Sequence, residues 1–480
     1  YQDISFYTNS KLNIHIPRIV LSIMVWSGFA KTNHFVSLIS QKYIFIFITL
    51  LLLVYFDSSF VDLSERFHLP ANKAFLNGIF LIFLSLFIFI NVLLIFTIKN
   101  VFLKNYSILG EKVKIIHNFI VIYLITISLL ITILFFEMAI YNSYSIYLIY
   151  SLLIITHFTG IYFSVWGTIK FLNWFKANKD KLLLVYAISF ITISVLITLS
   201  LIYTLTELGN SPETITPSDL KRTIHVISVN LSEIYPFYRI SFFITFCSIW
   251  VLTAFLLYDY FGRNNRLKFW LILSIPMIFF LIEFFPVTLK LLISLYQLNP
   301  SLFLPFYTIL STIITFIGAT MVSMTLWLLI RKIPNKSFRN YLILVAFGLL
   351  LVLISTHETP FPRFLFPPFG LITILFIGLA IYLLFMGFYS ASLHISKDMS
   401  LVKNFANRIH QYGFFRNIAK SQLEQDIKVI MIKALQSNEF DIRQKEKEHQ
   451  QELEKEDIEK LFQIVKNELE FKRSSNNQKK

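Results

Sequence analysis

Cysteine, glycine and charge are all scarce in this 480-residue chain. The single cysteine, Cys247, excludes an internal disulfide and has no companions at metal-ligand spacing. Charged residues make up 15% of the chain, against about 25% in an ordinary soluble domain. Hydrophobic residues make up 56%, and so few charges could not cover that much apolar surface in water. The composition therefore excludes a soluble globule and a disulfide-rich scaffold.

Ten apolar stretches reach or approach the length of about 20 residues with which a helix crosses a bilayer. They are residues 43–57, 74–98, 115–140, 146–169, 182–205, 238–258, 269–289, 302–330, 341–355 and 368–392. We therefore predict an all-α fold, a polytopic transmembrane helical bundle of about ten spans with a short cytoplasmic helical tail. Residues 16–30 are also apolar, but they are short and carry Arg18, so we interpret them as an interfacial helix, with an eleventh span as the alternative.

Basic residues alternate between the loops in a way that predicts the threading. Loops after even-numbered spans hold 15 Lys and Arg residues, whereas loops after odd-numbered spans hold 6. Basic loops stay in the cytoplasm, so we predict a multi-pass cell-membrane protein with both termini inside. The formal net charge of +15 is then a topology signal, and we expect a lipid bilayer rather than nucleic acid as the partner.

The C-terminal tail differs in composition from the membrane body. Residues 397–480 contain 31 charged residues of 84, with 17 basic and 14 acidic. Ser421 and Glu424 form a capping-box pattern that predicts the start of a helix. Apolar stripes follow at helical spacing, so we predict a protein partner or self-association through 421–470. The expected regions are an interfacial or cytoplasmic segment 1–42, a transmembrane domain 43–392 and a partly disordered cytoplasmic tail 393–480.

The two longest outer connections carry few chemical signals. The first, 206–236, contains Asn230 in an Asn-Leu-Ser triplet, which matches the N-glycosylation pattern. The second, 357–368, holds four prolines that predict a stiff loop leading into the last span at Phe369. Its His357-Glu358 pair lacks the second histidine of a zinc-protease motif. We find no catalytic constellation, metal-ligand cluster or phosphate-binding loop, so we expect no cofactor and favour a role other than catalysis, with the question of an enzyme left open.

Of the ionisable residues within predicted spans, where charge is costly, three are the functional candidates. His157 lies 11 residues into the fourth span, about 16 Å deep at 1.5 Å per residue. Glu283 lies between two prolines of the seventh span, and Glu137 lies near the outer end of the third. One interpretation joins His157 and Glu283 in an outward-facing polar cavity. The other makes His157 a neutral interhelical hydrogen-bond donor and leaves Glu283 paired or reaching outward.

The end of the membrane body resembles a group of uncharacterised multi-pass membrane proteins of ammonia-oxidising archaea. The resemblance rests on Pro-Pro-Phe-Gly at 367–370, an apolar span ending in Gly-Phe-Tyr-Ser-Ala-Ser at 387–392, and the charged tail. It covers about residues 340–435. The group has no known activity, so the resemblance implies a membrane location and no catalytic residues.

Two functional hypotheses follow from these patterns. We predict a sensor or scaffold-type membrane domain that couples to partners through its cytoplasmic helical tail, because the last span runs on into that tail. The alternative is a transporter or channel for an ion or small solute that uses His157 and Glu283. An intramembrane enzyme ranks third, since its catalytic groups are not found together.

Overall fold

The computed structural model describes a helical membrane body, and the chain divides into two compact units, residues 1–50 and 51–480. The residues that the structure describes are 45–46, 48–57, 60, 73–103, 111–179, 181–209, 212–216, 234–257, 269–271, 273–274, 277–278, 294, 319–320, 322–323, 326–327, 330, 336–357, 366–397 and 427.

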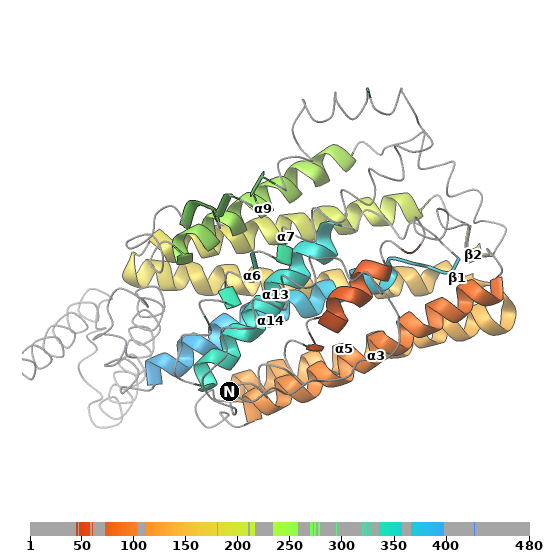
Figure 1. Ribbon diagram of the computed structural model, residues 1–480, viewed down its shortest axis with the longest axis horizontal. Coiled ribbons are helices and arrows are strands. Elements are labelled where there is room, and N and C mark those ends of the chain that lie inside the picture. Colours follow the sequence, from red (N-terminus) through yellow and green to blue (C-terminus); the bar gives the residue numbers. More distant parts are fainter. Residues whose placement is uncertain are drawn as a thin grey trace, which may run out of the picture. The chain divides into compact units, whose positions relative to one another are not determined.

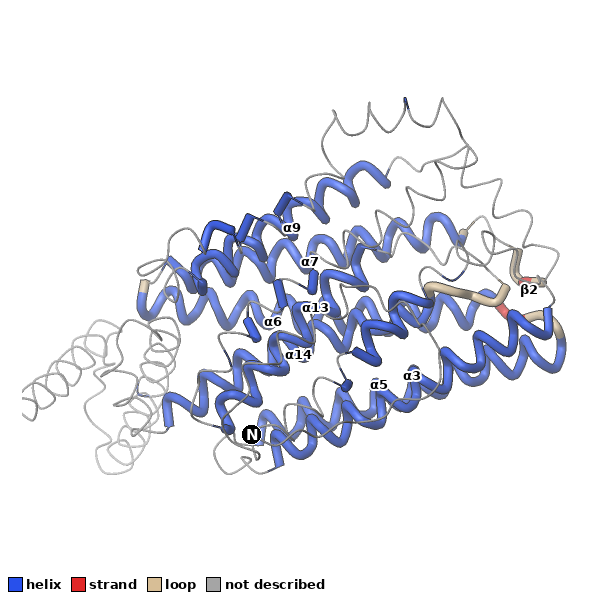
Figure 2. The backbone as a smooth tube through the Cα atoms, viewed as in Figure 1, coloured by secondary structure: helices blue, strands red, loops and turns tan. Residues whose placement is uncertain are grey.

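Seven long apolar helices dominate the described residues (Figures 1 and 2). Each contains a segment of 19 to 32 residues whose length and composition allow it to cross a membrane. The all-α prediction is confirmed for this part of the chain. The helices are α3 (Lys73–Leu103), α5 (Glu111–Tyr141), α6 (Ile146–Asn178), α7 (Lys181–Leu208), α9 (Ile234–Leu257), α13 (Lys336–His357) and α14 (Leu371–Lys397).

These helices coincide with seven of the ten predicted spans, the second to sixth, the ninth and the tenth. The first predicted span, 43–57, contains a shorter apolar helix, Ile48–Asp57. The seventh and eighth predicted spans lie mostly outside the described residues. Residues 16–30 and, apart from Ile427, the tail beyond Lys397 also lie outside them.

Two short strands join the helix ends on one side of the bundle, and sequence patterns did not predict them. β1 (Tyr144–Ser145) lies between α5 and α6 and pairs antiparallel with β2 (Thr214–Ile215), which follows α7. Ser145 is also the N-cap of α6, because its side chain accepts a hydrogen bond from the Tyr147 amide at 3.3 Å. At the other end of α6, Lys179 adopts a left-handed conformation, with φ 51°, before α7 begins.

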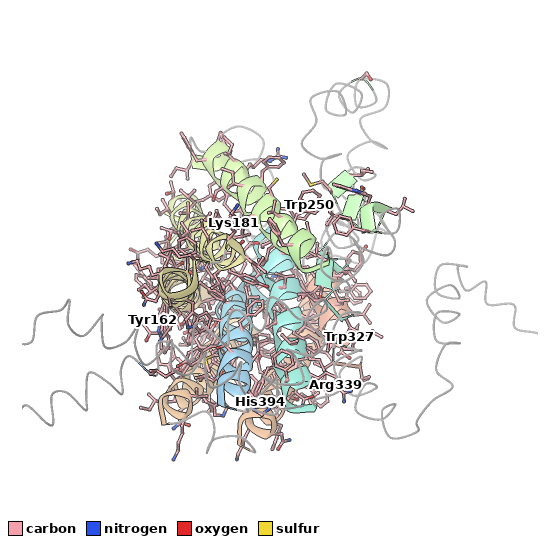
Figure 3. All side chains as sticks on the ribbon, turned by 90° about the vertical axis from the view of Figure 1, so that its left-hand side faces the viewer. Tyr162, Lys181, Trp250, Trp327, Arg339 and His394 are labelled. Carbon is pink, nitrogen blue, oxygen red and sulfur yellow. The ribbon has the colours of Figure 1, made fainter. Side chains whose placement is uncertain are left out.

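Helix α14 forms the centre of the bundle (Figures 1 and 3). It packs against α13, α6, α5 and α3, and its membrane-crossing window is 100% buried, compared with 39% for α3 and 33% for α5. Helices α13 and α14 approach backbone to backbone. A Cβ atom added at Gly348 would lie 2.5 Å from the Leu384 amide nitrogen, and one added at Gly387 would lie 2.8 Å from the Tyr341 carbonyl oxygen. The scarce glycines are therefore used where the two helices meet.

Candidate functional site

His157 lies in the middle of α6, fully buried between that helix and α7. Its Nδ1 lies 2.8 Å from the Leu153 carbonyl oxygen, one helical turn earlier, and its Nε2 lies 3.3 Å from Ser200 Oγ of α7. A carbonyl oxygen only accepts, so Nδ1 carries the hydrogen, and in the neutral imidazole Nε2 accepts from the Ser200 hydroxyl. His157 therefore links α6 to α7 with both ring nitrogens engaged.

A second link lies beside it and extends to α5 and α14. Tyr123 of α5 is fully inside the bundle, and its hydroxyl donates to the Leu375 carbonyl oxygen of α14 at 3.1 Å. The same hydroxyl lies 3.4 Å from Thr156 Oγ1, the residue next to His157. A Cβ atom added at Gly378 would overlap the Tyr123 hydroxyl, so glycine is needed there for α14 to approach. We call Tyr123, Thr156, His157 and Ser200 the polar layer.

The polar layer connects four helices at one level of the bundle. Its side chains are all buried, and each one has a hydrogen-bond partner. Interhelical hydrogen bonds of this kind fix the register of helices inside a membrane. The arrangement can therefore hold α14 at a defined height relative to α5, α6 and α7.

The structure describes only part of the predicted polar site. Glu283 and Asn230 lie outside the described residues, so the pairing of His157 with Glu283 stays a prediction. Glu137 is engaged at the turn between α5 and α6, where its Oε2 accepts a hydrogen bond from the Ser145 amide at 3.1 Å. Ser145 precedes His157 by 12 residues, about 18 Å along α6, so Glu137 is not part of the polar layer.

Asp57 is a buried carboxylate that sequence reasoning missed. It lies at the end of the helix Ile48–Asp57 and is 0% exposed. Its Oδ2 accepts hydrogen bonds from both the amide nitrogen and the Oγ1 of Thr373, each at 2.9 Å. Thr373 is the third residue of α14, so the carboxylate lies where backbone N–H groups lack helical partners and the helix dipole favours negative charge. The other oxygen, Oδ1, is buried without a hydrogen-bond partner.

Phenylalanine rings surround the turn that leads into this end of α14. The Phe369 ring packs against the rings of Phe60, Phe80 and Phe83, with centroid separations of 4.7, 5.8 and 6.0 Å. Gly370 follows with φ 88°, a conformation that other residues rarely adopt. The chain therefore enters α14 through a tight, apolar turn beside the Asp57 carboxylate. We call Asp57 and Thr373 the α14 cap.

The signals for Asp57 in the sequence were weak. It stands at the end of a predicted span and before Ser58 and Ser59, where an acidic residue is typical of a loop. Its partner Thr373 is 316 positions away, so no local spacing connects the two. Only the three-dimensional arrangement shows that the carboxylate belongs to the first turn of α14.

Seven long apolar helices, one of which is buried along its whole membrane-crossing window, define a multi-pass integral membrane protein of the helical-bundle class. Among the described residues, no group of three or more His, Cys, Asp and Glu side chains could hold a metal ion. No protein-family model, curated protein or solved structure matches the chain. Its function is therefore argued from the geometry of the polar layer and the α14 cap.

Proposed function

We propose that the protein is a sensor or scaffold of the cell membrane in which α14 is the output element. One observation carries this proposal: the most buried helix of the bundle continues without interruption to Lys397, where the charged tail begins. A helix that crosses the bilayer and enters the tail can transmit a shift as a rigid element. The tail, through 421–470, would then bind a protein partner or a second copy.

Two contacts connect α14 to elements that precede it in the chain. The α14 cap fixes its first turn to Asp57, and the Tyr123 hydroxyl fixes its second turn to α5. Both contacts lie in its first five residues, whereas the tail follows its other end. A displacement at the capped end would therefore reach the tail along a continuous hydrogen-bonded helix.

The threading completes the proposal. About ten spans, with basic loops inside, put the N-terminal segment and the tail in the cytoplasm and the α14 cap towards the outer surface. The 15 to 6 distribution of basic residues supports this orientation. The resemblance of residues 340–435 to membrane proteins of ammonia-oxidising archaea is part of the same proposal, and it suggests no chemical activity.

A distance measurement across the cytoplasmic ends of the helices tests the output role of α14. In a Cys247→Ser background, spin labels at Lys181→Cys and Ser400→Cys report the position of the tail relative to α7 in lipid nanodiscs. The Gly378→Ala change forces α14 away from the Tyr123 hydroxyl. We expect it to shift the distance distribution, and we expect Tyr123→Phe in the same chain to restore part of the original distribution, because it removes the overlapping oxygen.

Gly78→Ala is the matched control for this experiment. A Cβ atom at Gly78 of α3 would meet nothing within 4 Å, so it should leave the distances unchanged. An unaltered distribution in a folded Gly378→Ala protein would show that α14 does not transmit a displacement to the tail. That result would contradict the proposed output role.

A further inference from the structure

We propose that Asp57 Oδ1 is a proton-binding site and that its protonation loosens the first turn of α14. The site consists of a fully buried carboxyl with one oxygen held by Thr373 and the other oxygen unpartnered. The proton site stands on this geometry alone. Only its role as an input to the tail rests on the proposed function.

Few groups in the described part of the chain influence whether the Asp57 carboxyl is charged or neutral. The groups that act on it within the described part of the chain are the Thr373 amide and hydroxyl and the Gly370 backbone, and no second titratable side chain acts on it there. Thr373 Oγ1 also lies 3.3 Å from the Val54 carbonyl oxygen. A carboxylate away from water is costly unless hydrogen bonds compensate. Here the two hydrogen bonds from Thr373, the Gly370 backbone and the helix terminus supply that compensation.

The donor set fits a proton better than a metal ion. A metal ion needs several oxygen ligands, whereas Oδ2 is already occupied by two donors from Thr373. The Thr373 amide and the positive end of the α14 dipole both face the carboxylate, so they would repel a metal ion and also favour the charged carboxylate, whereas burial favours the neutral acid. A proton needs a single oxygen, and Oδ1 is the buried carboxyl oxygen that makes no hydrogen bond.

Proton binding changes the cap without breaking a covalent bond in the protein. An O–H bond of a hydronium ion breaks, an O–H bond forms at Oδ1, one water molecule is released and the carboxyl becomes neutral. Oδ2 then accepts neutral hydrogen bonds from Thr373, which are about half as strong as bonds to a charged carboxylate. The helix dipole also loses its negative partner. The first turn of α14 should therefore open more often in acid than at neutral pH.

Infrared difference spectroscopy of the full chain in lipid nanodiscs tests proton binding directly. Between about pH 8 and about pH 4.5, we expect a carboxylic-acid C=O band that disappears in Asp57→Asn. Glu137→Gln is the matched control and should keep the band, because Glu137 belongs to a different contact. A titrating band that is unchanged in Asp57→Asn, or no such band in wild type, would overturn the proposal.

Hydrogen exchange tests the consequence for α14. After correction for intrinsic pH effects, exchange at 371–375 should be about 2- to 30-fold faster in acid, the effect of losing a helix cap. Asp57→Asn should exchange fast at every pH. Equal pH dependence in wild type and Asp57→Asn would contradict the loosening of α14.

Thr373→Val keeps the experiment decisive if Asp57→Asn does not fold. It removes the hydroxyl donor but keeps Asp57, so the acid band should appear at higher pH than in wild type, and an unmoved band would count against the site. The spin-label distances at Lys181→Cys and Ser400→Cys separate the two proposals. If the band behaves as expected but the tail does not move with pH, the proton site stands and the output role of α14 fails.

Discussion

Gly348 lies where the backbones of α13 and α14 approach closely, so Gly348→Ala should destabilise the bundle. The added Cβ atom would lie 2.5 Å from the Leu384 amide nitrogen and 2.8 Å from the Ala380 carbonyl oxygen. Both atoms belong to the backbone of α14. No change of side-chain rotamer can therefore relieve the overlap, and the helices themselves have to separate.

The size of the effect follows from that separation. Ordinary contacts between heavy atoms lie at about 3.5 Å or more, so the helices must move apart by about 1 Å at this point. A gap of that size loses a quarter to a half of the dispersion energy of each affected atom pair, and overpacking of this kind costs about 1–3 kcal/mol. Replacing glycine by alanine within a helix also stabilises the folded state by about 0.5–1 kcal/mol. We expect a net loss of up to about 2.5 kcal/mol, or a factor of up to about 70 in the unfolding equilibrium.

Reversible unfolding in mixed micelles, followed against the fraction of denaturing detergent, measures this free energy. Gly78→Ala is the control, because its Cβ atom meets nothing within 4 Å. The control should gain about 0.5–1 kcal/mol, as expected for an unobstructed helical position. If Gly348→Ala were as stable as Gly78→Ala, the close approach of α13 and α14 would be wrong.

Three further changes test the inner contacts by the same measurement. Gly167→Ala places a Cβ atom 2.7 Å from the Phe190 ring and should lower the free energy of unfolding by about 1–3 kcal/mol. Adding Phe190→Leu to the same chain should restore part of that free energy, so the two changes should not be additive. Ser200→Ala removes only the hydroxyl beside His157 Nε2, and it should lower the free energy of unfolding by about 0.6 kcal/mol, the average value of an interhelical hydrogen bond in a membrane protein. An unchanged free energy of unfolding would contradict the hydrogen bond between His157 and Ser200. Tyr123→Phe should cost up to about 1.7 kcal/mol, whereas a Tyr→Phe change on the exposed face of α6 should cost nothing measurable.

Hydropathy predicted most of the described helices, but it placed their ends poorly. The fourth predicted span ends at 169, whereas α6 continues to Asn178. Lys170 and Lys176 lower the hydropathy there, yet long basic side chains can extend away from the apolar region while the backbone stays helical. Lys170 does so against an aromatic surface, with its Nζ 5.5 Å from the centre of the Tyr389 ring. Apolar composition therefore does not mark the full length of a helix, and Phe171 and Trp174 are buried although they lie beyond the predicted end.

The candidate sites were less accessible to sequence reasoning than the helices. His157 was found because a histidine at mid-span depth is unusual, but its partner Ser200 is one of many hydroxyl residues in α7. Tyr123 gave no signal, because tyrosine is common in this chain and its partner is a backbone carbonyl. Pairings of this kind depend on the relative heights of helices, which composition and periodicity do not specify.

Asp57 shows what such a pairing adds to the physical argument. Hydrocarbon makes an isolated carboxylate costly, so this one is retained only where the first turn of α14 supplies donors for it. The dependence is mutual, because the amides of that turn need an acceptor that the helix itself cannot provide. Loss of the charge therefore removes the strongest acceptor at the start of α14, at the end opposite the tail. A chain with so few ionisable groups in its membrane body can thus couple one protonation event to its central helix.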